Sequence, residues 1–337
     1  MQLAVKSKQQ RLSHGDIWRL LNESPYYETK LGAAYLGDAL QLIEHLPDSS
    51  VNLIVTSPPF ALKRKKEYGN VDPEQYVSWF SPFADQFLRV LKEDGSLVIH
   101  IGDSWNEGEP TKSLYAYKLL LDLCEQKHFR LAQDFYWHNP AKLPAPAEWV
   151  NVRRVRVKDT VEFVWWFSKN EFPKADNRKI LKPYSDSMVG LLKNGYKAKL
   201  RPSGHNISTN FSKDRGGAIP PNIFSILQSH DDEPTNLFTI SNTDSNSRYL
   251  KLNREHGTKV HPARYPDALP DFFIRFLIDD GDKVLDPFGG SNVTGVVAER
   301  LGRKWMAFEI REEYLKGSMF RFDDEQLMRK PKIVISA

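Results

Sequence analysis

A short apolar run that leads into a proline turn is the feature that most restricts how this chain can fold. Residues 51–55 are mostly apolar and β-branched, as in a buried parallel strand, and Pro58 and Pro59 follow them. Residues 74–91 then repeat large apolar side chains at helical spacing, and residues 96–101 form a second apolar run. This order of strand, turn, helix and strand predicts a parallel β-sheet of the α/β class.

The same alternation of strands and helices returns in two separate parts of the chain. Further strands are predicted at residues 135–138, 160–167, 283–286 and 304–309, and further helices at residues 114–127, 270–279 and 293–301. Residues 170–256 are rich in Asn, Ser, Lys, Pro and Gly, and their scattered apolar side chains favour an ordered, loop-rich insertion over a disordered linker. We therefore expect a core of residues 31–169 and 257–322, an inserted region of residues 170–256, and terminal extensions at residues 1–30 and 323–337, the last of them loosely held.

Composition and charge limit the class of protein. The 337 residues are 40% hydrophobic, which is enough to fill the core of a folded domain. The formal net charge of +4 permits a polyanionic partner without requiring one. The single cysteine, Cys124, excludes an intramolecular disulfide and a cysteine-built zinc cluster, and no His, Asp and Glu residues have metal-ligand spacing, so we expect no metal. Because the sequence has neither a signal-peptide core nor an apolar run of membrane-spanning length, we expect a cytoplasmic protein with no membrane partner.

A glycine turn lies between a predicted strand and a predicted helix near the C-terminal end. It contains Phe288, Gly289, Gly290 and Ser291, and Glu309 ends the next predicted strand about 20 residues further on. Glycines let a ligand approach the backbone, the helix N-terminus offers N–H groups, and the acid can accept bonds from ribose hydroxyls. The pattern indicates a site for an adenosine-containing ligand, although a tight packing turn would give similar spacing.

Asp286 narrows the choice of ligand. It precedes the glycine turn, where its carboxylate would repel the diphosphate of a dinucleotide. The turn also lacks the G-x-G-x-x-G pattern of dehydrogenases. We expect S-adenosylmethionine as the cofactor, because its methionine ammonium would be attracted by a carboxylate.

The predicted strand at residues 51–55 ends in a stiff turn formed by Ser57, Pro58, Pro59 and Phe60. Two successive prolines fix the backbone and remove two N–H donors, so the carbonyl groups of the turn can accept hydrogen bonds from elsewhere. A rigid pair of acceptors beside an aromatic ring can hold an amine. A strand-ending turn with a buried phenylalanine is the plainer interpretation of the same residues.

Together, the two turns resemble the motifs of the amino-methylating DNA methyltransferases, whose catalytic motif is (D/N/S)-P-P-(Y/F/W). The catalytic turn precedes the cofactor turn, which is similar to the permuted β-group arrangement of that family. More closely, the chain resembles the PvuII-type N4-cytosine methyltransferases at residues 56–62, 64–70, 201–205, 211–214 and 261–264. The resemblance covers about residues 35 to 322 and implies a permuted Rossmann-like, S-adenosylmethionine-dependent methyltransferase fold, with residues 170–256 as a smaller inserted target-recognition region.

The resemblance also implies roles for individual residues. Ser57 and Pro58 would accept hydrogen bonds from the target amine, and Phe60 would stack on a base flipped out of duplex DNA. The implied cofactor-binding residues are Asp38, His261, Pro262, Asp286, Phe288, Gly289, Gly290, Ser291 and Glu309. The turn departs from the usual F-x-G-S-G-T after Ser291, so contacts are expected from Gly289 and Ser291 rather than from Asn292.

Serine at position 57 favours cytosine N4 as the methylated atom, because adenine enzymes of the family mostly carry Asp or Asn there. N6-adenine methylation stays the alternative. A C5-cytosine enzyme would need a Pro-Cys nucleophile, and Cys124 lies in a helical pattern instead. The sequence shows no nuclease motif, so we expect the modification part of a restriction-modification system with a separate endonuclease. A nicotinamide-dependent oxidoreductase and a non-catalytic DNA-binding protein are the alternatives from other classes.

Basic residues are the expected contacts to DNA. Four of them follow the catalytic turn, where a basic loop would hold the duplex around a flipped base: Lys63, Arg64, Lys65 and Lys66. Basic residues at mainly alternating positions in residues 153–158 predict a strand with one phosphate-facing side, and Arg153, Arg154 and Arg156 of this segment are expected to contact DNA. Base reading is expected from Arg201, His205, Lys213 and Arg215. Solvated basic faces, and buried hydrogen-bonding roles for His205 and His261, are the plainer alternatives.

Overall fold

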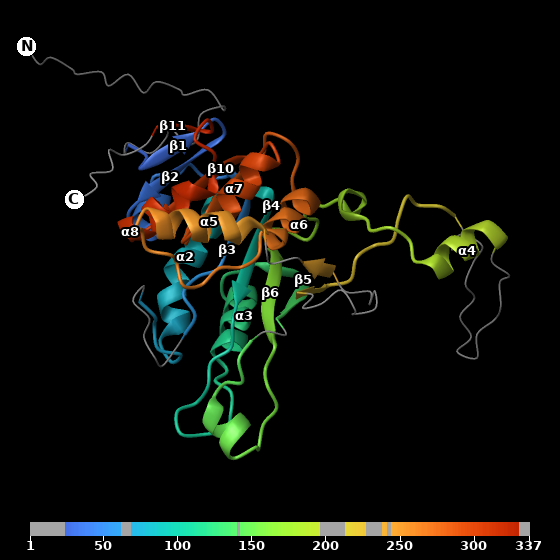
Figure 1. Ribbon diagram of the computed structural model, residues 1–337, viewed down its shortest axis with the longest axis horizontal. Coiled ribbons are helices and arrows are strands. Elements are labelled where there is room, and N and C mark those ends of the chain that lie inside the picture. Colours follow the sequence, from blue (N-terminus) through green and yellow to red (C-terminus); the bar gives the residue numbers. More distant parts are fainter. Residues whose placement is uncertain are drawn as a thin grey trace, which may run out of the picture.

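The computed structural model of the chain has a central β-sheet with a layer of helices on each face (Figure 1). It describes residues 24–61, 69–139, 142–195, 213–226, 238–240 and 244–329. Within these residues, no helix is long and apolar enough to cross a membrane.

In the described residues the sheet has eleven strands in the order β11-β1-β2-β10-β9-β3-β4-β6-β5-β7-β8. Their bounds are β1 Tyr27–Thr29, β2 Gly32–Leu36, β3 Val51–Thr56, β4 Leu91–Ile101, β5 Arg130–His138, β6 Val161–Ser168, β7 Ile223–Ile226, β8 Phe238–Ile240, β9 Lys283–Asp286, β10 Lys304–Glu309 and β11 Leu327–Arg329. Five neighbouring strands, β2, β10, β9, β3 and β4, are parallel, and β6 runs antiparallel to both β4 and β5. The C-terminal ends of the five parallel strands therefore lie along one edge of the sheet.

Each face of the sheet buries a separate apolar layer. On one face lie α1 (Ala39–Glu44), α2 (Tyr76–Val90) and α3 (Tyr115–Glu125). On the other lie α6 (Ala268–Leu277), α7 (Val293–Arg300) and α8 (Glu312–Ser318). In β3, Ile54 packs into the first layer, whereas Leu53 and Val55 pack into the second. Since both faces of β3 are covered, its sequence is a continuous apolar run rather than an alternating one.

The strands and helices predicted from the two periodic parts of the chain are confirmed. The six predicted strands coincide with β3, β4, β5, β6, β9 and β10, and the four predicted helices with α2, α3, α6 and α7. Boundaries differ by a few residues; β4, for example, begins at Leu91 rather than at residue 96. The sheet also contains β1, β2, β7, β8 and β11, which the sequence did not reveal.

The inserted region is joined to the core at several points. It contains η3 (Asn177–Ile180), α4 (Asp186–Asn194), β7, β8 and α5 (Asp244–Glu255). β7 pairs with β5, and Phe224 of β7 is fully buried against Phe135 and Phe272. In α5, Tyr249 and Asn253 are fully buried, and this helix packs beside α8. Figure 1 shows α4 standing well away from the sheet.

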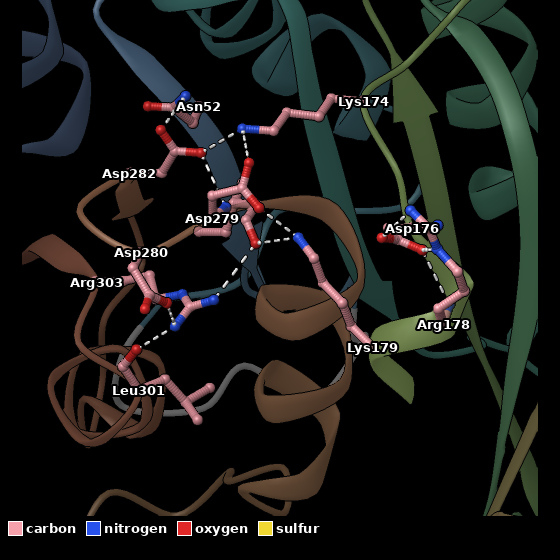
Figure 2. A network of polar contacts seen from close by, with 11 residues as sticks. Asn52, Lys174, Asp176, Arg178, Lys179, Asp279, Asp280, Asp282, Leu301 and Arg303 are labelled. Carbon is pink, nitrogen blue, oxygen red and sulfur yellow. Dashed lines mark hydrogen bonds and ion pairs between the residues drawn. The ribbon is translucent and has the colours of Figure 1, made fainter. Parts of the chain in front are cut away.

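A polar network fastens the start of the inserted region to the loop between α6 and β9 (Figure 2). The Lys174 ammonium lies 2.7 Å from the Asp279 carboxylate and 2.8 Å from that of Asp282. The Asp282 carboxylate also accepts a hydrogen bond of 2.9 Å from the Asn52 amide of β3. This network lies at the edge of the sheet opposite the C-terminal strand ends, because it surrounds the start of β9.

Two local predictions are wrong. Residues 153–158 form no strand; a short π-helix, η2 (Glu148–Val152), is followed by an irregular loop in which Arg154 has a positive φ of 54°. The Arg156 guanidinium lies 4.0 Å from the Trp105 ring centroid, so a tertiary contact replaces the expected alternation. The C-terminal extension is not loose throughout either, because β11 pairs with β1 at the edge of the sheet.

Candidate active site

The predicted catalytic and cofactor motifs lie side by side at the C-terminal edge of the parallel strands. β3, which leads into Ser57, neighbours β9, which leads into the glycine turn. The Thr56 hydroxyl donates a hydrogen bond of 2.8 Å to the Asp286 carboxylate and so joins the two strand ends. In a parallel α/β sheet, this edge is where ligands bind.

The glycine turn forms a close-fitting cradle. The Gly289 N–H donates to the Phe308 carbonyl at 2.7 Å, and a Cβ at Gly289 would lie 3.1 Å from that oxygen. Gly290 has a φ of 53°, and a Cβ there would lie 3.3 Å from the His261 ring. Phe288 is partly exposed above the first layer of helices. A side chain at Gly289 would crowd the Phe308 carbonyl, and one at Gly290 would crowd the His261 ring and be strained by the positive φ.

Arg321, which was not among the residues predicted from the sequence, holds the next residue of the turn. Its guanidinium donates to the Ser291 carbonyl at 2.6 Å and to the Ser291 hydroxyl at 3.0 Å. Burial lowers the pKa of Arg321 to about 10. Asn292 caps α7 by accepting the Gly295 N–H at 3.0 Å, which is a structural role. No local pattern marks Arg321, because it lies 30 residues beyond the turn.

Glu309 places a buried carboxylate beside the glycine turn. It accepts hydrogen bonds of 2.9 Å from the N–H groups of Gly290 and Arg311 and is 9% exposed. Burial raises the pKa of Glu309 to about 7, although the hydrogen bonds from the backbone N–H groups oppose this effect. The site therefore contains an acceptor whose protonation state changes near neutral pH.

Asp38 lies at the end of the neighbouring strand, β2. The Gly37 N–H donates to the Glu309 carbonyl at 3.0 Å, which holds the two strand ends together. The Asp38 Oδ1 caps α1 by accepting the N–H groups of Leu40 and Gln41 at 2.9 and 3.3 Å. The structure thus brings Asp38 and Glu309, both expected to bind the cofactor, to adjacent strand ends.

Asp286 differs from the expectation that its carboxylate faces the cofactor ammonium. It is 1% exposed and accepts four hydrogen bonds, from the hydroxyls of Thr56, Tyr265 and Thr294 and from the Phe288 N–H. Burial raises its pKa despite these bonds. Because two carboxylate oxygens accept about four hydrogen bonds in total, Asp286 holds the turn from behind rather than meeting a ligand.

His261 and Pro262 reach the site from the loop after α5. The His261 ring lies edge-on to Tyr314 at 4.5 Å between centroids and covers Gly290. Its Nδ1 lies 2.5 Å from the Ala263 carbonyl oxygen, while Pro262 is exposed. His261 is thus part of the wall of the cradle.

The catalytic turn is fixed by hydrogen bonds to its carbonyl groups. The Tyr76 hydroxyl donates to the Pro59 carbonyl at 2.9 Å, and the Asn70 amide donates to the Phe60 carbonyl at 2.6 Å. The Phe60 ring packs over Gly102, where a Cβ would lie 2.5 Å from it. Pro58 is buried, whereas Ser57 and Phe60 are partly exposed.

A histidine and a glutamate lie behind Ser57, and the sequence analysis missed both. The Ser57 Oγ lies 3.0 Å from His100 Nδ1, and His100 Nε2 lies 2.8 Å from Glu162 Oε2. A polar residue near the C-terminal end of the predicted apolar strand at residues 96–101 was a signal for His100. Glu162 gave no such signal, because it meets His100 only through the pairing of β4 with β6.

The basic residues expected to bind DNA have different surroundings. Arg153 is exposed and paired with Glu148 at 2.8 Å, and Arg154, Lys213 and Arg215 are also exposed. Arg156 is instead held by Trp105, the Pro110 carbonyl and Asp159 and is only 16% exposed. The remaining predicted contacts lie outside the described residues: Lys63, Arg64, Lys65, Lys66, Arg201 and His205.

The residues at this edge fit S-adenosylmethionine. The two glycines let the Phe308 carbonyl and the His261 ring approach the backbone of the turn closely, and Glu309 is a buried carboxylate of the kind that binds ribose hydroxyls. The Ser-Pro-Pro-Phe turn follows β3, which is separated by one strand, β9, from β10 and its terminal Glu309. A parallel sheet with this pair of motifs defines an S-adenosylmethionine-dependent methyltransferase that acts on an amine.

Comparison with known proteins identifies the family. A family model described as DNA methylase matches residues 51–320. The chain is 49% identical over 321 residues to the type II methyltransferase M.PvuII of Proteus hauseri, covering 94% of this chain and 91% of that protein. It is 28% identical over 316 residues to M.BamHI of Bacillus amyloliquefaciens, covering 91% and 61%. The solved structure of the PvuII DNA methyltransferase (cytosine-N4-specific) superposes with a TM-score of 0.70 at 43% identity, covering 90% of each chain. The chain belongs to the DNA methylase family of N6 and N4 amino methyltransferases, and it is an enzyme that uses S-adenosylmethionine.

Proposed function

We propose that the enzyme methylates the N4 amine of a cytosine that is flipped out of duplex DNA. The observation that carries this proposal is the position of Ser57, at the end of β3 and one strand from the glycine cradle. The relationship to M.PvuII and to the solved cytosine-N4-specific enzyme supports cytosine as the base and N4 as the atom. A stacked base cannot reach such a site, so the base has to leave the helix.

The residues that would hold the cofactor surround the cradle. Glu309 would accept bonds from the ribose hydroxyls, Asp38 from the adenine amine, and the backbone of Gly289 and Gly290 would lie against the ligand. His261 covers Gly290 and would line the methionine side. When bound, S-adenosylmethionine supplies a methyl group on a positively charged sulfur.

The catalytic turn makes the amine nucleophilic. The lone pair of a cytosine amine is delocalised into the ring, so the nitrogen is a poor nucleophile at rest. Ser57 Oγ and the Pro58 carbonyl each accept one N–H, which favours a more tetrahedral nitrogen with its lone pair directed at the methyl group. Phe60 packs on the flipped base and holds its plane. Transfer is then a direct in-line displacement that needs neither a metal nor a covalent enzyme intermediate.

The wider biological role follows from the relatives. We infer that the enzyme is the modification partner of a separate restriction endonuclease and works in the cytoplasm, because M.PvuII and M.BamHI are type II methyltransferases. We assign target recognition to the part of residues 170–256 that stands away from the sheet. α5 is better placed as support for the core, since its Tyr249 and Asn253 are fully buried.

Analysis of the modified nucleoside tests this function. Duplex DNA methylated with labelled S-adenosylmethionine should yield N4-methylcytosine after digestion, and N6-methyladenine would overturn the choice of base. The variant Ser57→Ala should keep cofactor affinity within about twofold but transfer methyl groups at least about 100-fold more slowly. Ser78→Ala, an exposed position on α2, is the matched control. Near-normal turnover of Ser57→Ala would reject the role of Ser57.

A further inference from the structure

Four side chains form a continuous polar chain that leads away from the catalytic serine. Ser57 Oγ lies 3.0 Å from His100 Nδ1, and His100 Nε2 lies 2.8 Å from Glu162 Oε2. The other Glu162 oxygen accepts a hydrogen bond of 2.9 Å from the Lys142 ammonium. The four residues come from the ends of β3 and β4, the start of β6 and the loop after β5, so the fold itself assembles them.

The His100 ring is held in place by aromatic neighbours. It is 5% exposed and lies edge-on to Phe60, Trp137 and Tyr265 at centroid distances of 5.4, 5.2 and 6.1 Å. Among these neighbours only Tyr265 is titratable, and its hydroxyl bonds to Asp286. The charged group that faces the ring directly is therefore Glu162, with Lys142 behind it. A ring held in this way has one orientation toward Ser57.

The protonation states of the chain follow from Glu162. Burial alone would raise the pKa of this carboxyl, but the hydrogen bonds with His100 and Lys142 and the charge of Lys142 lower it below its usual value. An ionised carboxylate can only accept, so the hydrogen between the two side chains is on His100 Nε2. In the neutral ring Nδ1 then carries a lone pair, which accepts the Ser57 hydroxyl hydrogen. The lone pairs of Ser57 Oγ are left for the N–H of the substrate amine.

We propose that His100, oriented by Glu162, is a positioning residue that directs the Ser57 oxygen at the target amine and takes the proton released by methylation. This inference rests on the proposed N4 methylation. The amine nitrogen forms a bond to the methyl carbon as the carbon–sulfur bond breaks and its electron pair stays on sulfur. The nitrogen, now cationic, loses a proton to Ser57 Oγ while the serine proton moves to His100 Nδ1. One positive charge thus passes from the sulfonium to an imidazolium beside Glu162, and it leaves as a proton to water after the product departs.

Single-turnover methylation measures this role directly. With saturating labelled S-adenosylmethionine and duplex DNA, His100→Ala should bind the cofactor normally but transfer the methyl group about 100-fold more slowly. Added imidazole should restore part of that rate, which a loss of packing alone would not allow. Glu162→Gln should slow transfer by about tenfold or more, because the tautomer is no longer fixed. His45→Ala, at an exposed position after α1, is the control and should behave as wild type.

A spectroscopic measurement on the wild-type enzyme tests the proposal without requiring that a variant of His100 folds correctly. Nitrogen NMR of histidine-labelled protein should show His100 as the neutral tautomer with its hydrogen on Nε2, and Glu162→Gln should weaken that preference. A hydrogen on Nδ1 in the wild type would overturn the proposal, as would His100→Ala transferring methyl groups within threefold of the wild-type rate. If wild type itself forms no N4-methylcytosine, the proposed function fails instead, so the two failures are distinguishable.

Discussion

Glu309 is a buried carboxylate at the point where the cofactor ribose is expected. Its ionised form is the stronger acceptor for two hydroxyl groups, and its pKa of about 7 in the ligand-free enzyme means that binding below neutral pH has to release a proton. Cofactor affinity should therefore be constant above about pH 8 and fall by up to about tenfold per pH unit below about pH 6. Calorimetric titration over this range, in buffers of different ionisation heat, measures both the affinity and the released proton.

Glu309→Gln provides the comparison, because it keeps the side-chain length and removes the titration. The variant should bind the cofactor more weakly at pH 8 and approach the wild-type affinity at low pH. The same raised pKa affects stability: the contribution of this group is present below pH 4.5 and is lost as the pH rises through about 7. Equal pH dependence of cofactor binding in the variant and the wild type would assign the effect to another group.

At the scale of elements, the sequence predicts those strands and helices whose burial by neighbouring elements produces a regular pattern of apolar residues. β3 was predictable because both of its faces are buried, which makes its apolar run continuous. β7 was not, because it has only four residues and is held by pairing with β5 and by Phe224, which packs against Phe135 and Phe273 from distant parts of the chain. α5 has polar residues over most of its length, and among its described side chains the fully buried Tyr249 and Asn253 join it to the core.

The polar network of Figure 2 should contribute measurably to the attachment of the inserted region. Lys174 bridges Asp279 and Asp282, and the Asp282 side chain is 18% exposed, which limits screening by solvent. Lys174→Met leaves two neighbouring acids without this cation, so the free energy of unfolding should fall by about 1 kcal/mol. Urea unfolding measures this change, and the difference should shrink at high salt. Lys193→Met, at an exposed position on α4, is the control; equal losses in both variants would show that the network contributes nothing.

At the scale of the whole molecule, local motifs predicted the location of the candidate site but not the residues that position its side chains. Ser57 and Glu309 could be assigned to the candidate site because Ser57 follows a strand at a proline turn and Glu309 ends the strand that comes after the glycine turn. His100 and Glu162 are 62 residues apart and meet only because β4 and β6 pair, and Arg321 reaches Ser291 from beyond α8. Asp286 was expected to face the ligand because it precedes the glycine turn. Its burial behind the turn could not be foreseen, because it depends on three hydroxyl groups from different segments. The residues expected to contact ligands follow short sequence patterns, whereas the residues that position them depend on tertiary packing.

The net charge of +4 says little about DNA binding, because the position of the charges decides it. The connection between β5 and β6 extends well beyond the strands of the sheet (Figure 1). It lies at the end of the sheet where β4 ends, and its Arg153 and Arg154 are exposed. The Arg153 side chain is 62% exposed in its ion pair with Glu148. Because an exposed ion pair contributes little free energy, a DNA phosphate can replace the carboxylate at small cost. Arg156 is held by Trp105 and Asp159 and should contribute less.

Replacing Arg153 and Arg154 together by Gln should therefore weaken DNA binding without affecting cofactor binding. The slope of log affinity against log salt concentration should become shallower by about 0.9 for each phosphate that the variant no longer neutralises. Fluorescence anisotropy with a labelled duplex over a series of salt concentrations measures this slope. Lys304→Gln removes one charge at the start of β10, at the opposite edge of the sheet, and should leave the slope unchanged. If the double variant keeps the wild-type slope, the duplex does not meet this connection, and its phosphates have to be neutralised by other basic residues.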